Sequence, residues 1–303
     1  MSQTATVDST ALHAMEGKID ELPLLPQVLV KIMQLSPSSN DYFEQFEHLA
    51  KEDPGFAVRI IALANSASSS PVVPIASISN ALTRMGTQTI CSLVASLAVQ
   101  RVFTPTKPNE IRLWQHSIST ALAAQRIAEL APQLGVNPGE AYLTGLLHDI
   151  GRFIMFEHAS AELQKVDEAN WQSPDELIDA DVEIFKFTHS ELGYLACMHW
   201  GMPDLVSAVI KDHHSPISED ITPGSMQALM FCVQIADRLC ISLIEQPELV
   251  ELNEQESAKR IGFDCLQTPY EQSLISPAVL AANVEQIRTE SNDILSGLGF
   301  APT

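Results

Sequence analysis

The stretch GLLHDIG (residues 145–151) decides how the rest of this chain is interpreted. It interrupts an aliphatic run with a histidine, an aspartate and a glycine, although Leu146, Leu147 and Ile150 alone would suit a helix in a core. Two interpretations are open. Either His148 and Asp149 lie on a polar seam of an ordinary helix, or they are half of a metal site, since imidazole and carboxylate groups bind divalent metal ions.

The sequence around this stretch predicts a single helix. NPGEAYLTGLLHDIGRFIMFEH (residues 137–158) begins with Asn137, a favourable N-cap residue, and Pro138 suits the first helical position. On such a helix the histidine and the aspartate point about 100° apart, and both can still reach one ion. Gly151 leaves room for another segment to approach closely.

Most of the remaining sequence is also typical of helices. Strand-like alternation is nearly absent and no fixed-period repeat occurs, so an all-α fold is expected. The stretch LPLLPQVLVKIMQLS (22–36) predicts a helix, SASSSPVVP (66–74) predicts a loop, and TPTKPNE (104–110) is the best internal boundary. From residue 276 onwards, SPAVLAANVEQIRTESNDILSGLG predicts one last amphipathic helix that packs on the body of the protein.

Composition and charge narrow the function. The chain has 303 residues, 46% of them hydrophobic and 18% charged, which is typical of a folded protein. The net charge of −21 argues against nucleic acid or an anionic membrane as partner. No secretory signal and no membrane-spanning stretch is evident. The five cysteines are never in CxxC spacing and are expected to be buried free thiols, so we expect a cytoplasmic protein.

Other polar residues in apolar surroundings are candidate ligands. They are His116, His189, His213, His214 and Asp237. A lone buried carboxylate such as Asp237 is costly without a partner. Structural alternatives stay open, because Asp237 could pair with Arg126 or Arg238, Asp149 could accept hydrogen bonds from a helix start, and the paired histidines could be a polar helix end.

These segments, taken in order, resemble the HDOD domain, a branch of the HD superfamily of metal-dependent phosphohydrolases. The resemblance is carried by LPLLPQVLVKIMQL, LAKEDPGFAVRIIALANS, SISNALTRMG, LWQHS, EAYLTGLLHDIGR, HSELGYLACMHWGMPDLVSAVIKDHH and QIAD, which together extend from residue 22 to about residue 243. It implies an N-terminal helical lobe (21–105) packed on an HD-like helical lobe (106–246). Residues 1–20 would then be a flexible tail, and residues 247–303 would be helices packing on the body.

The resemblance also implies a set of site residues. The H…HD…D metal-binding pattern of the HD superfamily falls on His116, His148, Asp149 and Asp237. The related HD-GYP phosphodiesterases have further histidines at a multinuclear centre, and their counterparts here are His189, His213 and His214. The implied cofactor is one or two divalent ions, namely Fe, Mn, Zn, Ni or Mg.

Two departures from those relatives bear on catalysis. No Gly-Tyr-Pro follows His214, because the sequence continues as SPISEDITPGS. Arg152 stands where active relatives usually have a lysine after HDIG. Arginine stays charged at neutral pH and does not donate a proton to a leaving group, although it can hold a phosphate. Asp149 and Arg152 are therefore the expected catalytic residues of an active enzyme, and specific hydrolysis of cyclic di-GMP is not expected.

The favoured function at this point is a bacterial signalling and regulatory module that binds a protein partner or a small phosphorylated ligand. The alternative is an active phosphohydrolase acting on a nucleotide or another phosphoester, and a third interpretation is a helical scaffold without a working site. The sequence leaves the oligomeric state open. The feature that separates the first two is whether the seven His and Asp side chains converge around an open coordination position.

Overall fold

We describe the fold from a computed structural model of the chain. The structure describes residues 9–21, 75–86 and 107–300 without 170 and 172, and scattered residues between 44 and 105. The helix predicted over 22–36 and the loop predicted over 66–74 lie outside these residues. Regular structure in the described ranges is entirely helical, which confirms the all-α prediction.

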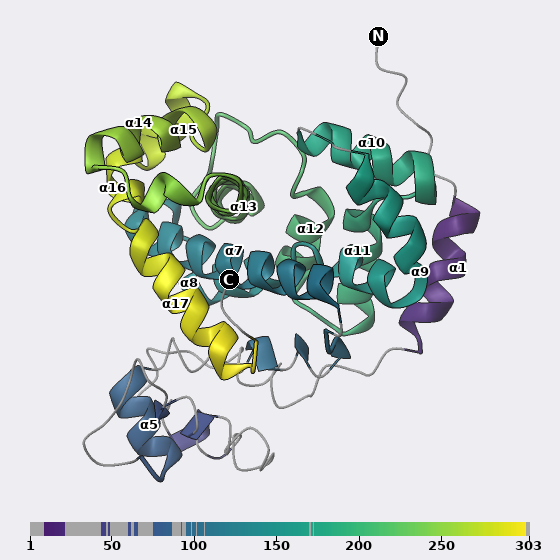
Figure 1. Cartoon of the computed structure of the whole chain (residues 1–303), viewed down its shortest axis with the longest axis horizontal. Coiled ribbons are helices and arrows are strands. Elements are labelled where there is room, and N and C mark those ends of the chain that lie inside the picture. The colour runs from purple at the N-terminus through teal and green to yellow at the C-terminus, as the bar shows by residue number, and fades with distance from the viewer. Residues whose placement is uncertain are drawn as a thin grey trace.

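The helices follow one another along the chain as shown in Figure 1. They are α1 (Ser9–Ile19), α5 (Ile78–Met85), α7 (Pro108–Leu130), η2 (Pro132–Leu134), α8 (Pro138–Leu147), α9 (Ile150–Glu168), α10 (Pro174–Phe185), α11 (His189–His199), α12 (Asp204–Asp212), α13 (Met226–Glu245), η3 (Pro247–Val250), α14 (Glu254–Asp264), α15 (Pro269–Leu274), α16 (Pro277–Ala281) and α17 (Val284–Gly297).

Helices α7 and α8 form the centre of the fold because small residues let their backbones meet. A Cβ atom added to Gly145 would lie 2.9 Å from the Cα of Ala121 and 2.9 Å from the carbonyl oxygen of Thr120. This close crossing brings His116, one turn before Thr120, next to His148, one turn after Gly145.

The helix predicted over 137–158 is interrupted at the two residues that matter most. Helix α8 ends at Leu147, His148 keeps helical dihedrals, and Asp149 has φ −99° and ψ 17° before α9 begins at Ile150. Those dihedrals lie in the sparsely populated bridge region, where many active-site residues are found. The prediction of one continuous helix was therefore wrong, and the break directs the two side chains independently.

Gly151 allows α9 and α11 to approach closely, as predicted. A Cβ atom at this position would overlap the carbonyl oxygen of His189, and its other neighbours would be the carbonyl carbon of His189 and the amide nitrogen of Gly193. Since no larger side chain fits, this contact fixes the start of α11 against the start of α9. His189 is thereby held beside Asp149.

Helix α13 forms much of the buried core and is seen end-on beside α7 in Figure 1. By length and hydropathy it could cross a membrane, but 72% of its apolar window is buried inside the protein, as in a core helix. The four cysteines in the described part of the chain are buried and free, as predicted: Cys197, Cys232, Cys240 and Cys265. Cys91 lies outside the described residues.

Hydrogen bonds connect the described residues of the N-terminal segment to the later helices. The hydroxyl groups of Ser96 and Tyr142 are 2.8 Å apart, and Gln100 donates to the carbonyl oxygen of Leu298. The indole of Trp114 donates to the carbonyl oxygen of Phe103. Ser96, Gln100 and Phe103 thus contact α8, the end of α17 and α7, respectively.

Both ends of the chain differ from expectation. Residues 9–19, predicted as part of a flexible tail, form α1, seen at the right edge of Figure 1, which packs on α11 with Ile19 buried. The apolar residues of α1 explain its order, because packing on α11 removes them from water. The single C-terminal helix predicted from residue 276 is two helices, α16 and α17, separated at Ala282 and Asn283. Its apolar residues pack on the body as predicted: Leu280, Val284, Ile287, Ile294 and Leu298.

Candidate metal centre

Four of the predicted ligands form one group, which we call the acidic half of the centre: His116, His148, Asp237 and the Oδ2 atom of Asp149. The Nε2 atom of His116 lies 3.1 Å from Oδ1 of Asp237 and 3.2 Å from Nε2 of His148. Oδ2 of Asp149 lies 3.8 Å and 3.6 Å from the same two nitrogens. These atoms come from α7, the α8–α9 junction and α13, so only the tertiary fold brings them together.

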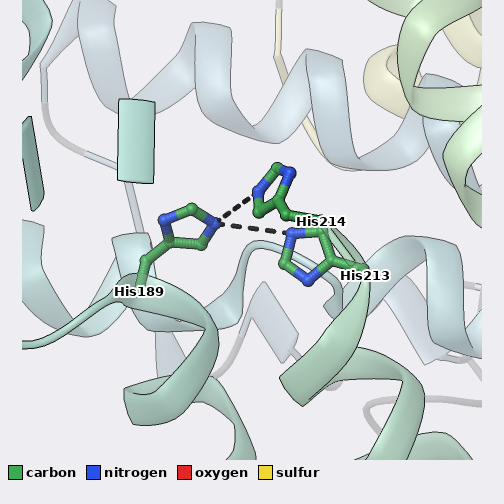
Figure 2. Close-up of side chains that lie close together, drawn as sticks. All are labelled: His189, His213 and His214. Atoms are coloured by element: carbon green, nitrogen blue, oxygen red, sulfur yellow. Dashed lines mark hydrogen bonds between the residues drawn. The ribbon is translucent and has the colours of Figure 1, made fainter. Parts of the chain in front are cut away.

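The remaining histidines form a second group, the imidazole half: His189, His213, His214 and the Oδ1 atom of Asp149. Figure 2 shows the three rings pointing toward one another, with Nε2 of His189 3.4 Å from Nε2 of His213 and 3.0 Å from Nε2 of His214. Oδ1 of Asp149 is 3.3 Å from Nε2 of His189. The start of α11 and the end of α12 supply these ligands.

Asp149 belongs to both halves, because its two carboxylate oxygens face different sets of nitrogen atoms. A carboxylate in this position can bind two ions at once, one through each oxygen. All seven residues proposed from the sequence as ligands are therefore brought together by the fold. Each half also contains three donor atoms within 4.8 Å of one another, which is close enough to hold an ion.

The imidazole rings are oriented for metal binding. The Nδ1 atom of His148 lies 2.8 Å from the carbonyl oxygen of Gly145, and that of His213 lies 2.7 Å from the carbonyl oxygen of Ile210. Each Nδ1–H donates to that oxygen, so the Nε2 lone pair faces the centre. Nε2 of His213, whose pKa is lowered, then presents its lone pair toward the space between the rings, where a cation can bind. The donor set fits a divalent ion of the Fe, Mn, Zn or Ni type.

The charges differ between the two halves. Burial alone would lower the pKa of His148, but the carboxylates of Asp149 and Asp237 outweigh it and raise the pKa to about 9. Burial would raise the pKa of both carboxyl groups, and the nearby histidines instead hold each pKa below its usual range. In the imidazole half, burial and the neighbouring rings lower the pKa of His213 and lower that of His214 to about 3.

A buried carboxylate that the sequence analysis missed supports the imidazole half. Oδ2 of Asp181 accepts from both the backbone amide and Nδ1 of His189, at 3.0 Å and 2.5 Å. Asp181 is completely buried on α10. The signal was present in the sequence, because Asp181 lies four residues from both Leu177 and Phe185, on the buried side of an amphipathic helix.

Arg152, predicted to hold a phosphate, is buried beside the centre. Its Nε lies 4.0 Å from Oδ2 of Asp149, and its terminal nitrogen donates to Asp167 at 2.6 Å. The second terminal nitrogen of the guanidinium is buried without a hydrogen-bond partner. Arg152 is therefore fixed by Asp167 and retains a free donor next to the centre.

The centre forms the floor of a cleft of about 620 Å³. Five of the seven proposed ligands line this cleft: His116, His148, Asp149, Asp237 and His214. His189 and His213 are buried behind them. The acidic half is consequently accessible to a small molecule, whereas the imidazole half contacts the cleft through His214 and Asp149 alone.

The sequence left two other roles open, an ion pair of Asp237 with an arginine and a polar helix end formed by His213 and His214. The described part of the structure shows neither of them. Arg126 pairs with Glu129 and Glu290, and Arg238 pairs with Glu271, so neither arginine is the observed partner of Asp237. His213 is almost completely buried and is not part of a solvated helix end.

Comparison with known proteins agrees with this architecture. The family model of the HDOD domain matches residues 22–216. A solved structure from Shewanella amazonensis, provisionally named a phosphohydrolase, has a TM-score of 0.67 at 20% identity and covers 96% of this chain and 98% of that one. Another from Marinobacter aquaeolei, provisionally named a signal transduction protein, has a TM-score of 0.69 at 19% identity and covers 98% of this chain and 67% of that one. At these identities the likeness shows the fold alone.

An uncharacterised protein of Treponema pallidum is 25% identical to this chain over 215 residues. The matched region is 70% of this chain but 41% of that protein, so the chain corresponds to less than half the length of this relative. Asp237 lies beyond the residues matched by the family model, and its place at the centre is a result of the structure.

Proposed function

The chain belongs to the HDOD domain family, and we propose that it is a metal-dependent phosphohydrolase that acts on a small phosphoester. The sequence alone favoured a binding module. The regulatory module and the enzyme differ in whether the ligands converge around an open coordination position. The converging ligands form the floor of an accessible cleft, and this supports the enzyme. The two separate faces of the Asp149 carboxylate are the observation that carries it.

The residues have distinct roles in this proposal. His116, His148, Asp149 and Asp237 would hold an ion accessible to the substrate, and His189, His213 and His214 would hold a second one with Asp149. A divalent ion bound there polarises a phosphoryl oxygen and lowers the pKa of a bound water. Arg152 would donate its free terminal N–H to a phosphate oxygen, and Asp167 would keep the guanidinium in place.

Metal content and hydrolysis test the proposal together. The protein is purified without an affinity tag or a chelator, and its metal is measured by mass spectrometry. Hydrolysis of bis(para-nitrophenyl) phosphate and para-nitrophenyl phosphate is then followed with added Mn²⁺ or Fe²⁺. We expect bound metal and metal-dependent hydrolysis, both of which are lost in Asp149→Asn because that change removes the shared charge.

Asp179→Asn is the matched control, because Asp179 is an exposed acid on α10 that is not part of the cleft lining. It should keep the metal content and activity of the wild type. A protein that binds metal but hydrolyses neither ester would contradict the phosphohydrolase and favour the second candidate. A protein without metal in any preparation would contradict both.

The second candidate is a regulatory module that binds the same class of phosphorylated ligand without turnover and passes the signal to a protein partner. The shortage of side chains in the cleft that can donate a proton to a leaving group favours this candidate. The described lining of the cleft contains no lysine, and His214, with its pKa lowered to about 3, is a poor proton donor at neutral pH. His148, whose pKa is raised, would lose its proton when metal binds. Binding of a phosphonate without hydrolysis of the matching phosphate would support this candidate.

A further inference from the structure

The cleft extends well beyond the metal centre, and its outer wall has a different chemistry. The end of α13 and the end of α14 contribute Ile241, Ile244 and Phe263 to the lining. Both helices lie beyond the residues matched by the HDOD family model. This part of the wall, which we call the outer wall, is therefore a feature that the family match does not account for.

The outer wall is apolar and exposed. Among the described residues, four large hydrophobic side chains are strongly exposed, and two of them, Phe263 at 81% and Ile244 at 59%, lie in this one cleft. Scattered exposed apolar residues need no explanation. Two of them in a concave surface that continues into a metal centre indicate a binding surface for an apolar group.

Two charged residues of the cleft lining, Asp264 and Arg238, are paired within the protein. Asp264 lies 3.4 Å from Nε of Arg260, and the guanidinium of Arg238 donates to Glu271 at 2.8 Å. Because Asp264 and Arg238 are neutralised by partners in the protein, a ligand group bound beside them does not have to carry a compensating charge. The outer wall thus suits an uncharged group, whereas the floor of the cleft suits an anion.

We propose that the outer wall binds a flat aromatic group of the ligand, with Phe263 as the residue that determines specificity. The inference rests on the proposed function, because the phosphoryl group of the same ligand is placed at the metal centre. Phe263 offers an aromatic face for stacking, and Ile244 covers the edge of the ring. The substrate class is then a phosphate ester of an aromatic alcohol or of a group carrying an aromatic ring.

Binding of two phosphonates, which the centre cannot hydrolyse, tests the inference. Naphthylmethylphosphonate and methylphosphonate are titrated into the Mn²⁺-loaded protein by calorimetry. We expect the naphthyl compound to bind about tenfold more tightly, because its ring is removed from water against Phe263. Phe263→Ala should remove most of that difference and leave methylphosphonate binding unchanged.

Val279→Ala is the matched control, since Val279 is another exposed apolar residue but lies on α16 outside the cleft lining. It should leave both affinities as in the wild type. Equal affinities for the two phosphonates in the wild type, or an advantage of the naphthyl compound that survives Phe263→Ala, would overturn the inference and leave the metal centre in place. Failure of both phosphonates to bind would overturn the proposed function and this inference together.

Discussion

The two halves of the centre differ in charge, access and support, although they share one carboxylate. The acidic half has two carboxylates, holds a histidine whose pKa is raised to about 9, and lines the cleft. The imidazole half contains neutral His213 and His214 at neutral pH, is largely buried, and is supported from behind by Asp181. In the proposed function, the acidic half would therefore meet the substrate, and the imidazole half would hold its ion away from the cleft.

The largest effect is expected from removing what the two halves share. Among the described residues, only Asp149 is a carboxylate that faces both groups of nitrogens. Asp149→Ala removes it, so both halves should lose metal, with affinity falling at least about a hundredfold. Mass spectrometry of dialysed protein measures this loss. If one half kept its metal, Asp149 would not be a shared ligand and the two halves would be independent sites.

The next effect concerns the contact that holds His189 beside Asp149. Gly151→Ala places a methyl group where the carbonyl oxygen of His189 lies, so α9 and α11 must separate. We expect a loss of about 3 kcal/mol in the free energy of unfolding, at the upper end for overpacking, measured by urea denaturation.

Gly17→Ala in α1 is the control for that measurement, because a Cβ atom at Gly17 meets no other atom within 4 Å. There the added methyl group should stabilise the helix slightly, by about 0.5 kcal/mol or more. Equal effects of the two changes would mean that the α9–α11 contact is not close.

Removing the carboxylate that supports His189 should lower the metal affinity of the imidazole half alone. Asp181→Asn removes the charge that accepts from Nδ1 of His189, and the metal affinity of the imidazole half should fall about tenfold or more. The acidic half should keep its affinity, because Asp181 contacts none of its ligands in the described structure. Competition with a coloured chelator resolves the two binding steps, and a parallel fall in both would contradict the distinction.

The smallest effect is a difference in pH dependence. In the metal-free protein the pKa of His148 is raised, so its contribution to stability is complete below its ordinary pKa of about 6.5 and is lost as the pH rises through about 9. A metal ion must displace this proton to bind His148. The metal affinity of the acidic half should therefore increase by up to about tenfold for each unit that the pH rises in that window.

Calorimetry in buffers with different enthalpies of ionisation counts the protons released. About one proton should leave when metal binds the acidic half at neutral pH, and His148→Gln should abolish both this release and the pH dependence of the metal-free stability. His213 and His214 should release no proton at that pH, because burial and neighbouring rings keep their pKa values low. Proton release that persists in His148→Gln would assign it to another group.

Much of the centre could be foreseen from the sequence, because its ligands are polar residues in apolar helices. His116 and Asp237 were recognisable in this way, and the similarity to the related HD-GYP phosphodiesterases implied His189, His213 and His214 as further ligands. Asp181 was missed although it follows the same rule, because its partner is an amide and a ring nitrogen eight residues along the chain. The outer wall could not be foreseen, since an exposed Phe263 has no distinguishing local pattern.

The sequence by itself determined the helical class, the helix start at Asn137 and the residue types that can bind metal, because caps, periodicity and ligand chemistry are local properties. The helix start at Asn137 formed as predicted. The tertiary structure alone decided the break at Asp149, the division of its two oxygens between two sets of ligands, and the cleft that exposes one set. Those features depend on how α7, α8, α9, α11, α12 and α13 pack against one another, and packing distances between distant segments are not encoded in any local pattern.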